Sequence, residues 1–365
     1  MILDTLAHSH LAHAPVQPQP LVSVVVVNFN GRFHLNNCLG SLLATNSPEV
    51  EIIFVDNHSS DGSAEYVADR FPEVQLLQRT VNDGYGSGNN SAAEVARGEY
   101  LVILNPDTVV TPGWWELLVD ALNSDPTVGM TTPKILLLDQ PERINTAGND
   151  IHISGLTLCR GMGESAESLT EMVEVTAVSG AAFAIRRDLF LALGGFDADF
   201  FMYMEDSDLS LRVQLAGYRC LVVPESVIYH DYALRIGPDK LYFQERNRYL
   251  MLLKTWRWRT LFLLLPTLVL TEMITWAFVL LQDRPRWRNK LKAYRAVWQQ
   301  RSAIRVKRQQ VQANRRISDR ELLQRLPYRL SFEQAGESAA TRAAHRLFDP
   351  LFWLMSWALC RIVVW

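Results

Sequence analysis

Residues 22–57, VSVVVVNFNGRFHLNNCLGSLLATNSPEVEIIFVDN, are the part of the chain from which the fold is predicted. They begin with the β-branched run 22–27 and end with the apolar run 52–55, and the leucines between the two runs follow helical spacing. Short continuous apolar runs are typical of strands buried on both faces of a parallel sheet. A strand, a helix and a strand in this order form a βαβ unit. The sequence therefore predicts an α/β protein whose central sheet is mostly parallel.

Polar residues follow both of these strands. Asn28 and Asn30 come directly after the first strand, and Asp56 comes after the second. Sheets of this class bind their ligands beyond the carboxyl ends of the strands, so Asp56 is well placed to contact a ligand. The alternative is that Asp56 only forms an Asx turn that caps the next helix.

A third strand is predicted at residues 74–77, followed by the glycine-rich loop 82–90, NDGYGSGNN. This loop opens another helical pattern, and free amides at a helix N-terminus suit a phosphate or a sugar. The glycine spacing does not match the dinucleotide-binding fingerprint, so the loop by itself is a weak signal.

A fourth strand is predicted at residues 100–104 and ends in Asn105-Pro106-Asp107. Pro106 cannot continue a central ladder, so Asp107 is expected at the edge of the sheet. Thr111 and Pro112 then predict the start of a helix, as its N-cap and first residue. Further short strands are predicted at residues 221–223 and 227–229.

An acidic cluster at residues 205–208, EDSD, places three carboxylates in four residues behind an aromatic run. Crowding like charges beside apolar side chains is costly unless a cation or a mobile proton compensates them, which favours a functional site. The alternative is an acidic helix N-terminus stabilised by the helix dipole. In either case Asp208 is expected to pair with Arg212, four residues later on the helix.

The motifs VSVVVVNFN, VDNHSSDGS, NDGYGSGNN, LNPDT, GGFDADFFMYMEDSDLSLR and VIYH follow one another along the chain. In this order they resemble the family-2 glycosyltransferases, in particular the bacterial rhamnosyltransferase-like members. The resemblance covers about residues 21–253. It implies a GT-A fold and an inverting transfer of a sugar, rhamnose or similar, from a nucleotide diphosphate to an acceptor hydroxyl.

The resemblance also implies roles for individual residues. Asp206 matches the catalytic base of the family, and Glu205 matches the residue just before it. Asp107 matches a metal ligand, Asn105 stands where the family's DxD motif has its first aspartate, and His230 matches a histidine that can complete the metal site. The expected cofactor is a divalent cation, Mg²⁺ or Mn²⁺, which neutralises the leaving diphosphate; an imidazole ligand suits Mn²⁺ better.

Donor binding is expected at the strand ends and in the glycine-rich loop. Asp56 would contact the nucleobase, Asn28 or Asn30 would lie beside the nucleotide, and the loop would pass along the diphosphate and the sugar. The residues expected to bind the donor are Asn28, Asn30, Asp56, Gly84, Gly86, Asn89 and Asn105.

The carboxyl-terminal third differs in character. Residues 261–281 and 348–365 are strongly apolar, and residues 284–320 between them hold thirteen Lys or Arg against one Asp, a net charge of +12 in a chain whose total is −3. Such a basic stretch binds an anionic membrane surface or a nucleic acid, and its apolar, Trp-rich neighbours favour phospholipid. Trp256 and Trp258 are expected at the membrane interface.

Residues 261–281 are long enough to span a bilayer. Glu272 near the middle of this segment would cost about 2.5–3.5 kcal/mol on insertion scales, so helices lying in the inner leaflet are favoured. The alternatives are one true span, or a soluble helical subdomain with this segment as its core.

The predicted organisation is a disordered tail at residues 1–20, a GT-A domain at 21–253 and a helical, basic, membrane-associating region at 254–365. Four widely spaced cysteines have no metal-ligand spacing and indicate reduced thiols, hence the cytoplasmic face of the inner membrane. The expected acceptor is lipid-linked or a cell-envelope polysaccharide. Because Asn105 weakens the metal motif, a nucleotide-sugar-binding pseudoenzyme is the alternative function.

Overall fold

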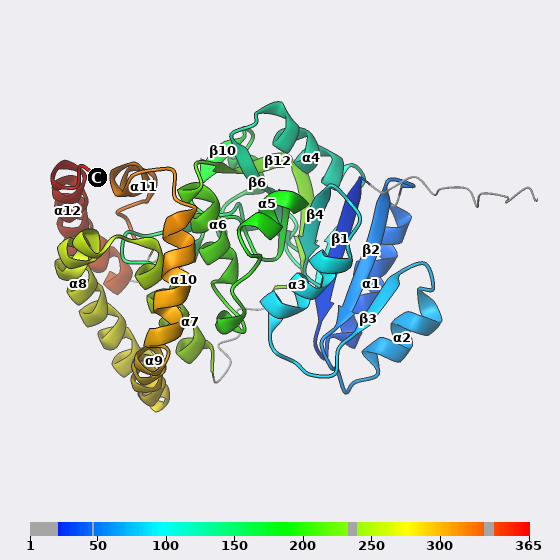
Figure 1. Ribbon diagram of the computed structural model, residues 1–365, viewed down its shortest axis with the longest axis horizontal. Helices are drawn as coiled ribbons and strands as arrows, with labels where there is room; N and C mark the ends of the chain where they lie inside the picture. The colour runs from blue at the N-terminus through cyan, green and yellow to red at the C-terminus, as the bar shows by residue number, and fades with distance from the viewer. Residues whose placement is uncertain (1–20, 46, 233–238, 332–338) are drawn as a thin grey trace, which may run out of the picture.

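The computed structural model describes residues 21–45, 47–232, 239–331 and 339–365. An α/β part that holds the sheet lies at one end of the molecule, and a bundle of helices from α7 to α12 lies at the other (Figure 1). The predicted tail, residues 1–20, falls outside the described residues.

The central sheet is mixed and has the strand order β10-β12-β6-β11-β4-β1-β2-β3, with β5 paired to β12 and β7 to β6. One side of it, β3-β2-β1-β4, is entirely parallel, while β11 runs antiparallel to both β4 and β6. The strands are β1 (Val22–Asn28), β2 (Val50–Asp56), β3 (Gln75–Gln78), β4 (Tyr100–Leu104), β5 (Thr108–Val110), β6 (Val128–Leu137), β7 (Ile144–Thr146), β10 (Val173–Val175), β11 (Ala182–Arg186) and β12 (Arg219–His230). A separate hairpin pairs β8 (Asn149–Ile151) with β9 (Thr157–Cys159).

Helices cover both faces of the sheet, which confirms the predicted α/β class. Every residue of β1 and of β4 is buried, as expected for strands between two helical layers. One apolar core contains residues of α1, α2 and α4, and a second contains residues of α3, α5 and α6. These helices are α1 (Arg32–Ala44), α2 (Ser63–Arg70), α3 (Tyr85–Val95), α4 (Trp114–Ser124), α5 (Arg187–Ala192) and α6 (Glu205–Leu215).

Two local predictions are wrong. Helix α4 begins at Trp114, after Gly113 at a φ of 77°, and the Thr111 hydroxyl instead donates a hydrogen bond to the backbone oxygen of Val227 at 2.6 Å. The two short strands predicted near residues 221–229 are one strand, β12, whose register against β6 shifts between Val223 and Val227. The shift lets one strand continue through a stretch that the sequence pattern divides.

The carboxyl-terminal helices share a third apolar core with α6 and with β8. Helix α7 packs against α9 and α10 and so joins the helical bundle to the α/β part. The helices are α7 (Lys240–Thr255), α8 (Trp258–Gln282), α9 (Trp287–Gln299), α10 (Arg301–Ala313), α11 (Asp319–Arg325) and α12 (Ala339–Ile362).

Helix α8 is the one helix in the described part of the chain that is long and apolar enough to cross a membrane, which by itself is weak support for a span. Only 22% of its most apolar 18-residue window is buried, whereas a helix at the core of a soluble subdomain is mostly buried. The expected pair of interfacial tryptophans is also divided: Trp256 is 1% exposed inside the third core, whereas Trp258 is 59% exposed.

Candidate active site

Asp206 lies in the first turn of α6, and backbone and side-chain donors from three elements hold its carboxylate. Its Oδ2 accepts hydrogen bonds from the backbone N–H of Gly180 at 2.8 Å and from Nδ2 of Asn149 at 3.2 Å. Its Oδ1 accepts one from the backbone N–H of Ser207 at 2.7 Å. The side chain is therefore fixed in orientation by neutral donors.

Glu205 is the buried neighbour of Asp206. It is 7% exposed, and its Oε2 has no hydrogen-bond partner. Burial, followed by the charges of Asp206 and Asp208, raises the pKa of Glu205 to about 8, and burial also raises the pKa of Asp206. Because the two carboxyl groups share one site, the pair retains a proton near neutral pH.

Asp208, the third carboxylate of the cluster, has a different environment. Its Oδ2 lies 2.8 Å from Nε of Arg212, which confirms the expected pairing, and its Oδ1 lies 2.8 Å from Nζ of Lys254 on α7. Asp208 is thus neutralised by two cations and joins α6 to α7. The sequence indicated the Arg212 contact, while Lys254 is too distant along the chain to be paired by spacing.

The loop before α6 is held in an unusual conformation by α7. Phe201, Tyr203 and Met204 have φ values of 61°, 67° and 67°, a region that costs about 1–3 kcal/mol for each such residue. Asn247, which is 0% exposed, donates from Nδ2 to the backbone oxygens of Phe200, Met202 and Tyr203 at 3.0, 2.9 and 2.7 Å. Asn247 therefore compensates the strain of the loop that presents Asp206.

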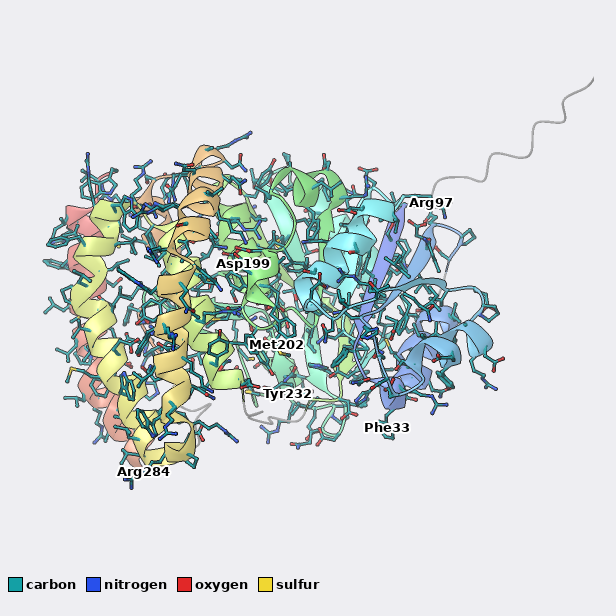
Figure 2. The ribbon with its side chains drawn as sticks, turned by 60° about the horizontal axis from the view of Figure 1, so that its bottom comes forward. Phe33, Arg97, Asp199, Met202, Tyr232 and Arg284 are labelled. Carbon is teal, nitrogen blue, oxygen red and sulfur yellow. The ribbon has the colours of Figure 1, made fainter. Side chains whose placement is uncertain are left out.

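Arg246 supports the same loop: its Nη2 donates to the backbone oxygens of Asp199 and Phe200 at 2.6 and 2.8 Å. Asp199 and Met202 lie along the junction between the helical bundle and the α/β part (Figure 2). Sequence reasoning missed Arg246 and Asn247, because a polar pair inside a helical pattern has no spacing that points to a loop forty residues earlier.

The glycine-rich loop packs against this loop before α6. A Cβ on Gly84, which has a φ of 103°, would lie 2.2 Å from the backbone oxygen of Phe201, and the same oxygen accepts the N–H of Tyr85 at 2.7 Å. A Cβ on Gly86 would lie 2.9 Å from Cβ of Phe196. Both glycines allow close packing of two loops, a role that the loop sequence did not reveal.

Asn89 and Tyr85 come from the same loop and helix. Asn89 is fully buried, donates from Nδ2 to the Tyr85 backbone oxygen at 3.0 Å, and keeps an unpaired Oδ1. Burial, then the charges of Glu205, Asp206 and Asp107, raise the pKa of Tyr85, whose hydroxyl donates to the backbone oxygen of Gly180 at 2.8 Å. Tyr85 was not predicted, and it lies within electrostatic reach of both the acidic pair and Asp107.

The predicted nucleotide residues gather where β1 and β2 end. Asp56 accepts the Ser59 backbone N–H at 3.0 Å but does not cap the next helix, because α2 begins only at Ser63; its other oxygen is buried without a partner. Asn28 donates to the Ser59 hydroxyl at 3.2 Å and likewise keeps an unpaired oxygen. Asn30 is exposed at a φ of 53° and accepts the Ser60 N–H at 2.8 Å. Two buried, unpaired oxygens leave acceptor positions for a ligand.

The predicted metal residues also meet. Nε2 of His230, at the end of β12, lies 3.1 Å from Oδ1 of Asp107, and its Nδ1 lies 2.9 Å from Oδ1 of Asn145. Burial would raise the pKa of Asp107, but its hydrogen bond and charge interaction with His230 lower it. Both ring nitrogens of His230 therefore donate to acceptor oxygens, Nδ1 to Asn145 and Nε2 to Asp107. Because Asn145 holds Nδ1, Nε2 is the ring nitrogen that would bind a metal placed between His230 and Asp107.

The donor set fits a cation that is bound together with a ligand. Within the described residues no group of three or more His, Cys, Asp or Glu side chains assembles, so Asp107 and His230 would supply only part of a coordination shell. Mg²⁺ is commonly held in this way, by one or two protein groups together with substrate phosphates. Asn105 contributes to the local turn: its backbone oxygen accepts the Thr108 hydroxyl at 2.7 Å.

Known proteins resemble this chain in sequence. The model of the glycosyl transferase family 2 matches residues 23–194. An N-acetylglucosaminyl-diphospho-decaprenol L-rhamnosyltransferase of Mycobacterium tuberculosis is 32% identical over 244 residues, which are 60% of this chain and 78% of that protein. The O-antigen biosynthesis protein RfbC of Myxococcus xanthus is 31% identical over 60% of this chain and 18% of its own length.

Solved structures agree on the fold. TarS residues 1–349 of S. aureus, in complex with UDP-GlcNAc, has a TM-score of 0.52 at 15% identity and covers 94% of this chain and 90% of its own. GalNAc-T7 with UDP, GalNAc and Mn²⁺ has a TM-score of 0.53 at 22% identity over 64% of this chain and 48% of its own. The sequence matches and the shared fold agree with the order of motifs along the chain: this protein belongs to the family-2 glycosyltransferases and has their GT-A fold.

Proposed function

We propose that the protein is an inverting glycosyltransferase that moves rhamnose, or a similar sugar, from a nucleotide diphosphate to a hydroxyl of a lipid-linked or cell-envelope acceptor. The observation that carries this proposal is the Glu205–Asp206 pair at the start of α6: burial raises the pKa of Glu205 to about 8, and neutral hydrogen-bond donors orient the Asp206 carboxylate. The name of the mycobacterial relative, a rhamnosyltransferase acting on a diphospho-decaprenol, supports the donor and acceptor classes.

Asp206 is the general base of this mechanism. A base must be oriented toward the proton it removes and must have a pKa near the working pH. The hydrogen bonds from Gly180, Asn149 and Ser207 meet the first requirement, and burial shifts the pKa of Asp206 upward, in the direction that the second requires. Glu205, kept neutral by its own raised pKa, allows Asp206 to be the ionised member of the pair and to take the proton of the acceptor hydroxyl.

The donor lies across the strand ends in this proposal. Asp56 and Asn28 offer their unpaired oxygens to the nucleoside, and the Gly84–Asn89 loop borders the diphosphate and the sugar. Asp107 and His230 hold a divalent cation, Mg²⁺ or Mn²⁺, which neutralises charge on the departing diphosphate when it is bound. The Mn²⁺ in the GalNAc-T7 structure, a protein of the same fold, supports a metal of this kind.

The proposed acceptor requires the protein to bind a membrane. A lipid-linked acceptor resides in a bilayer, and the net charge of +12 over residues 284–320 favours an anionic surface. We place the protein at the cytoplasmic face of the inner membrane, where nucleotide sugars are available.

The alternative function is a nucleotide-sugar-binding pseudoenzyme, which rests on Asn105 in the metal motif. It predicts that the protein binds the donor without turning it over.

Replacement of Asp206 tests the base. Asp206→Asn preserves the shape of the side chain and removes its basicity, so kcat should fall about 10²–10⁴-fold while donor affinity barely changes. Asp125→Asn, a change at an exposed carboxylate remote from the acidic pair, should leave kcat intact. Retention of more than about a third of the wild-type kcat in Asp206→Asn would contradict the role of general base.

Replacement of Asp107 tests the metal. Asp107→Ala should abolish metal-dependent donor binding, because it removes the charged ligand, and His230→Ala should weaken binding and change the preference between Mg²⁺ and Mn²⁺. Calorimetry measures both effects. Donor affinity that stays the same in EDTA would exclude a metal from the site.

A further inference from the structure

The side of α8 that faces away from the protein is a continuous apolar stripe. Trp258, Phe262, Leu265, Val269 and Met273 recur every three or four residues and are 47–71% exposed. This spacing places them along one side of the helix. An apolar surface of this length on a soluble protein marks a site of contact with a partner or a membrane.

Helix α12 extends the same surface. It packs beside α8, where the Thr267 hydroxyl reaches the sulfur of Met355 at 3.4 Å, and both helices form the end of the molecule farthest from β1 and β2 (Figure 1). Leu359 of α12 and Val363, which follows the helix, are buried in the third core. The exposed apolar residues of α12 are Leu347, Leu351, Trp353, Leu354, Trp357 and Ile362.

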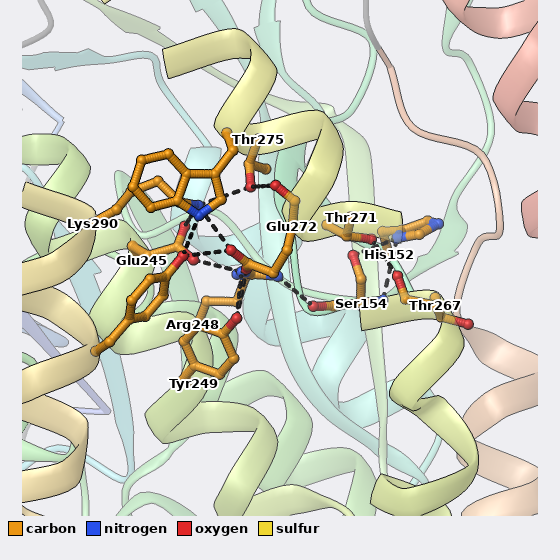
Figure 3. Close-up of polar contacts among 12 residues, drawn as sticks. His152, Ser154, Glu245, Arg248, Tyr249, Thr267, Thr271, Glu272, Thr275 and Lys290 are labelled. Atoms are coloured by element: carbon orange, nitrogen blue, oxygen red, sulfur yellow. Dashed lines mark hydrogen bonds and ion pairs between the residues drawn. The ribbon is translucent and has the colours of Figure 1, made fainter. Parts of the chain in front are cut away.

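The opposite side of α8 packs against the rest of the protein through ion pairs and hydrogen bonds. Just past the middle of the helix, Glu272 forms ion pairs with Arg248 of α7 and Lys290 of α9. It also accepts hydrogen bonds from the hydroxyls of Tyr249 and Tyr294, each at 2.5 Å (Figure 3). Glu272 is therefore compensated inside the protein and needs no partner in the membrane.

A second polar contact fastens the beginning of α8. The Thr260 hydroxyl donates to Asp319 of α11 and accepts the indole N–H of Trp365 at 3.0 Å. Asp319 is in turn paired with Arg315 at 2.7 Å. Charged partners thus lie against the helix both at Thr260 and at Glu272.

These two contacts decide how α8 can meet a bilayer. The residues from Thr260 to Glu272 cover about 18 Å of helix, more than half of a hydrocarbon core of about 30 Å. If α8 crossed the bilayer, the residue that contacts it at Thr260 or at Glu272 would enter the hydrocarbon with it. That residue is Asp319 of α11 or Lys290 of α9, and each buried charge would cost several kcal/mol. A helix lying along the interface keeps both contacts inside the protein.

Charge on the two helices matches an anionic surface. Within the described parts of α8 and α12 both acidic residues are ion-paired, Glu272 with Arg248 and Asp349 with Arg329. The basic residues, by contrast, are exposed, and Arg361 stacks over Trp357 at 3.9 Å, an arginine–tryptophan pair of the kind that suits a headgroup layer. The exposed cations are Arg259, Arg342, Arg346 and Arg361.

We propose that α8 and α12 together form a docking face that rests in the headgroup layer of an anionic phospholipid bilayer, with α8 parallel to the membrane plane and not across it. This proposal rests on the proposed function, because a lipid-linked acceptor lies in a bilayer and requires the enzyme to bind there. The orientation of α8 follows from its contacts at Thr260 and Glu272 and does not depend on the reaction.

Charge insertion tests the face. Phe262→Glu and Met273→Glu each place a carboxylate in the exposed stripe, so flotation of the full-length protein with phosphatidylglycerol-containing liposomes should fall at least about tenfold, because a buried apolar side chain contributes about 1.5–3 kcal/mol. Leu191→Glu on α5, a matched change at a 40% exposed leucine of the α/β part, should float like the wild type. Unchanged flotation of both stripe variants would overturn the proposal.

Light scattering without lipid distinguishes a membrane from a second copy of the chain. The wild type is expected to be a monomer, or an oligomer that Phe262→Glu leaves intact. A wild-type dimer that Phe262→Glu dissociates, with flotation unaffected, would assign the face to self-association and overturn the proposal.

Thiol labelling tests the orientation. Arg259→Cys and Arg284→Cys, introduced one at a time, flank α8 in a background in which Cys159 and Cys360 are replaced by serine and the two remaining cysteines, Cys38 and Cys220, are buried. An impermeant reagent should label both positions in inverted membrane vesicles and neither in spheroplasts. Labelling of the two positions from opposite sides would show a spanning helix and would overturn the in-plane arrangement.

The two proposals fail in different ways. Donor turnover measured without lipid reports on the proposed function and should be equal in the wild type and in Met273→Glu. A wild type that floats but turns over no nucleotide sugar would refute the reaction and leave the docking face standing.

Discussion

Two carboxylate pairs in this protein, each with one buried and one partly exposed member, have opposite surroundings. Glu205 and Asp206 begin α6 next to the glycine-rich loop, and in the part of the chain that the structure describes neither forms an ion pair. Glu245 and Glu272 meet between α7 and α8, where Arg248 lies 2.6 Å from Glu245, and Lys290 lies 3.2 Å from each of the two carboxylates (Figure 3).

The difference in partners reverses the effect of burial. Burial raises the pKa of Glu205 to about 8, and the nearby Asp206 adds to the rise. Burial would also raise the pKa of Glu272, but Arg248, the two tyrosine hydroxyls and Lys290 outweigh it and lower the pKa to about 2. A buried carboxylate left without a cation is available for proton transfer, whereas a compensated one joins two elements.

The largest effect is expected from removing the cation of the compensated pair. Arg248→Met leaves Glu245 and Glu272 buried with only Lys290, so the free energy of unfolding should fall by about 3–5 kcal/mol, as for other broken buried ion pairs. Urea denaturation measures the change. A loss below about 1 kcal/mol would mean that the cluster does not join α7 to α8.

The uncompensated pair should respond in the other direction. The folded-state pKa of Glu205 lies above its unfolded value of 4.5, so the folded protein binds the extra proton and its free energy of unfolding falls as pH rises from about 4.5 to about 8. Glutamine does not ionise, so Glu205→Gln removes this fall in the free energy of unfolding. The variant should be more stable than the wild type by about 1–3 kcal/mol at pH 9 and differ little from it at pH 4.

The opposite slope is expected for Glu272, whose stabilising contribution should be lost as pH falls from about 4.5 toward about 2. Denaturation across this pH range measures both slopes. A stability that rises with pH between 5 and 8 in the wild type, and not in Glu205→Gln, would reverse the assignment of Glu205.

A smaller effect, on catalysis, is expected at the contact between α7 and the loop before α6. Asn247→Asp keeps the size of the side chain and replaces the amide donor of three backbone oxygens, so kcat should fall about 10–100-fold through displacement of Asp206, with donor KM changed far less. Gln312→Glu, which likewise removes an amide that donates to two backbone oxygens, at 2.9 and 2.8 Å, is the control and should leave kcat intact. Equal losses in the two variants would indicate a structural role only.

The smallest effect is expected for a single hydroxyl of the compensated pair. Tyr294→Phe removes one of the hydrogen bonds to Glu272 while Arg248, Lys290 and Tyr249 remain, so the protein should lose about 1 kcal/mol. Thermal denaturation measures this loss. A loss as large as that of Arg248→Met would mean that the tyrosine, and not the cations, compensates Glu272.

The sequence by itself determined the α/β class and the strand ends at which Asn28, Asp56 and Asp107 lie, because buried parallel strands and the turns that follow them have local signatures. It also determined the acidic pair Glu205–Asp206 and the Asp208–Arg212 contact, which lie within one helix and obey its spacing.

The tertiary structure alone decided which residues hold that site and what the apolar helix contacts. The bonds of Asn247 to the loop before α6, the shielding of Trp256 and the ion pairs of Glu272 join segments that lie tens of residues apart along the chain. The apolar composition of α8 fits a core helix, a membrane span and an interfacial helix equally well. Only the packing of its polar side against α7, α9 and α11 distinguishes these three kinds of helix. Hydropathy depends on the residue types of a helix, and it does not show which side of the helix contacts the rest of the protein.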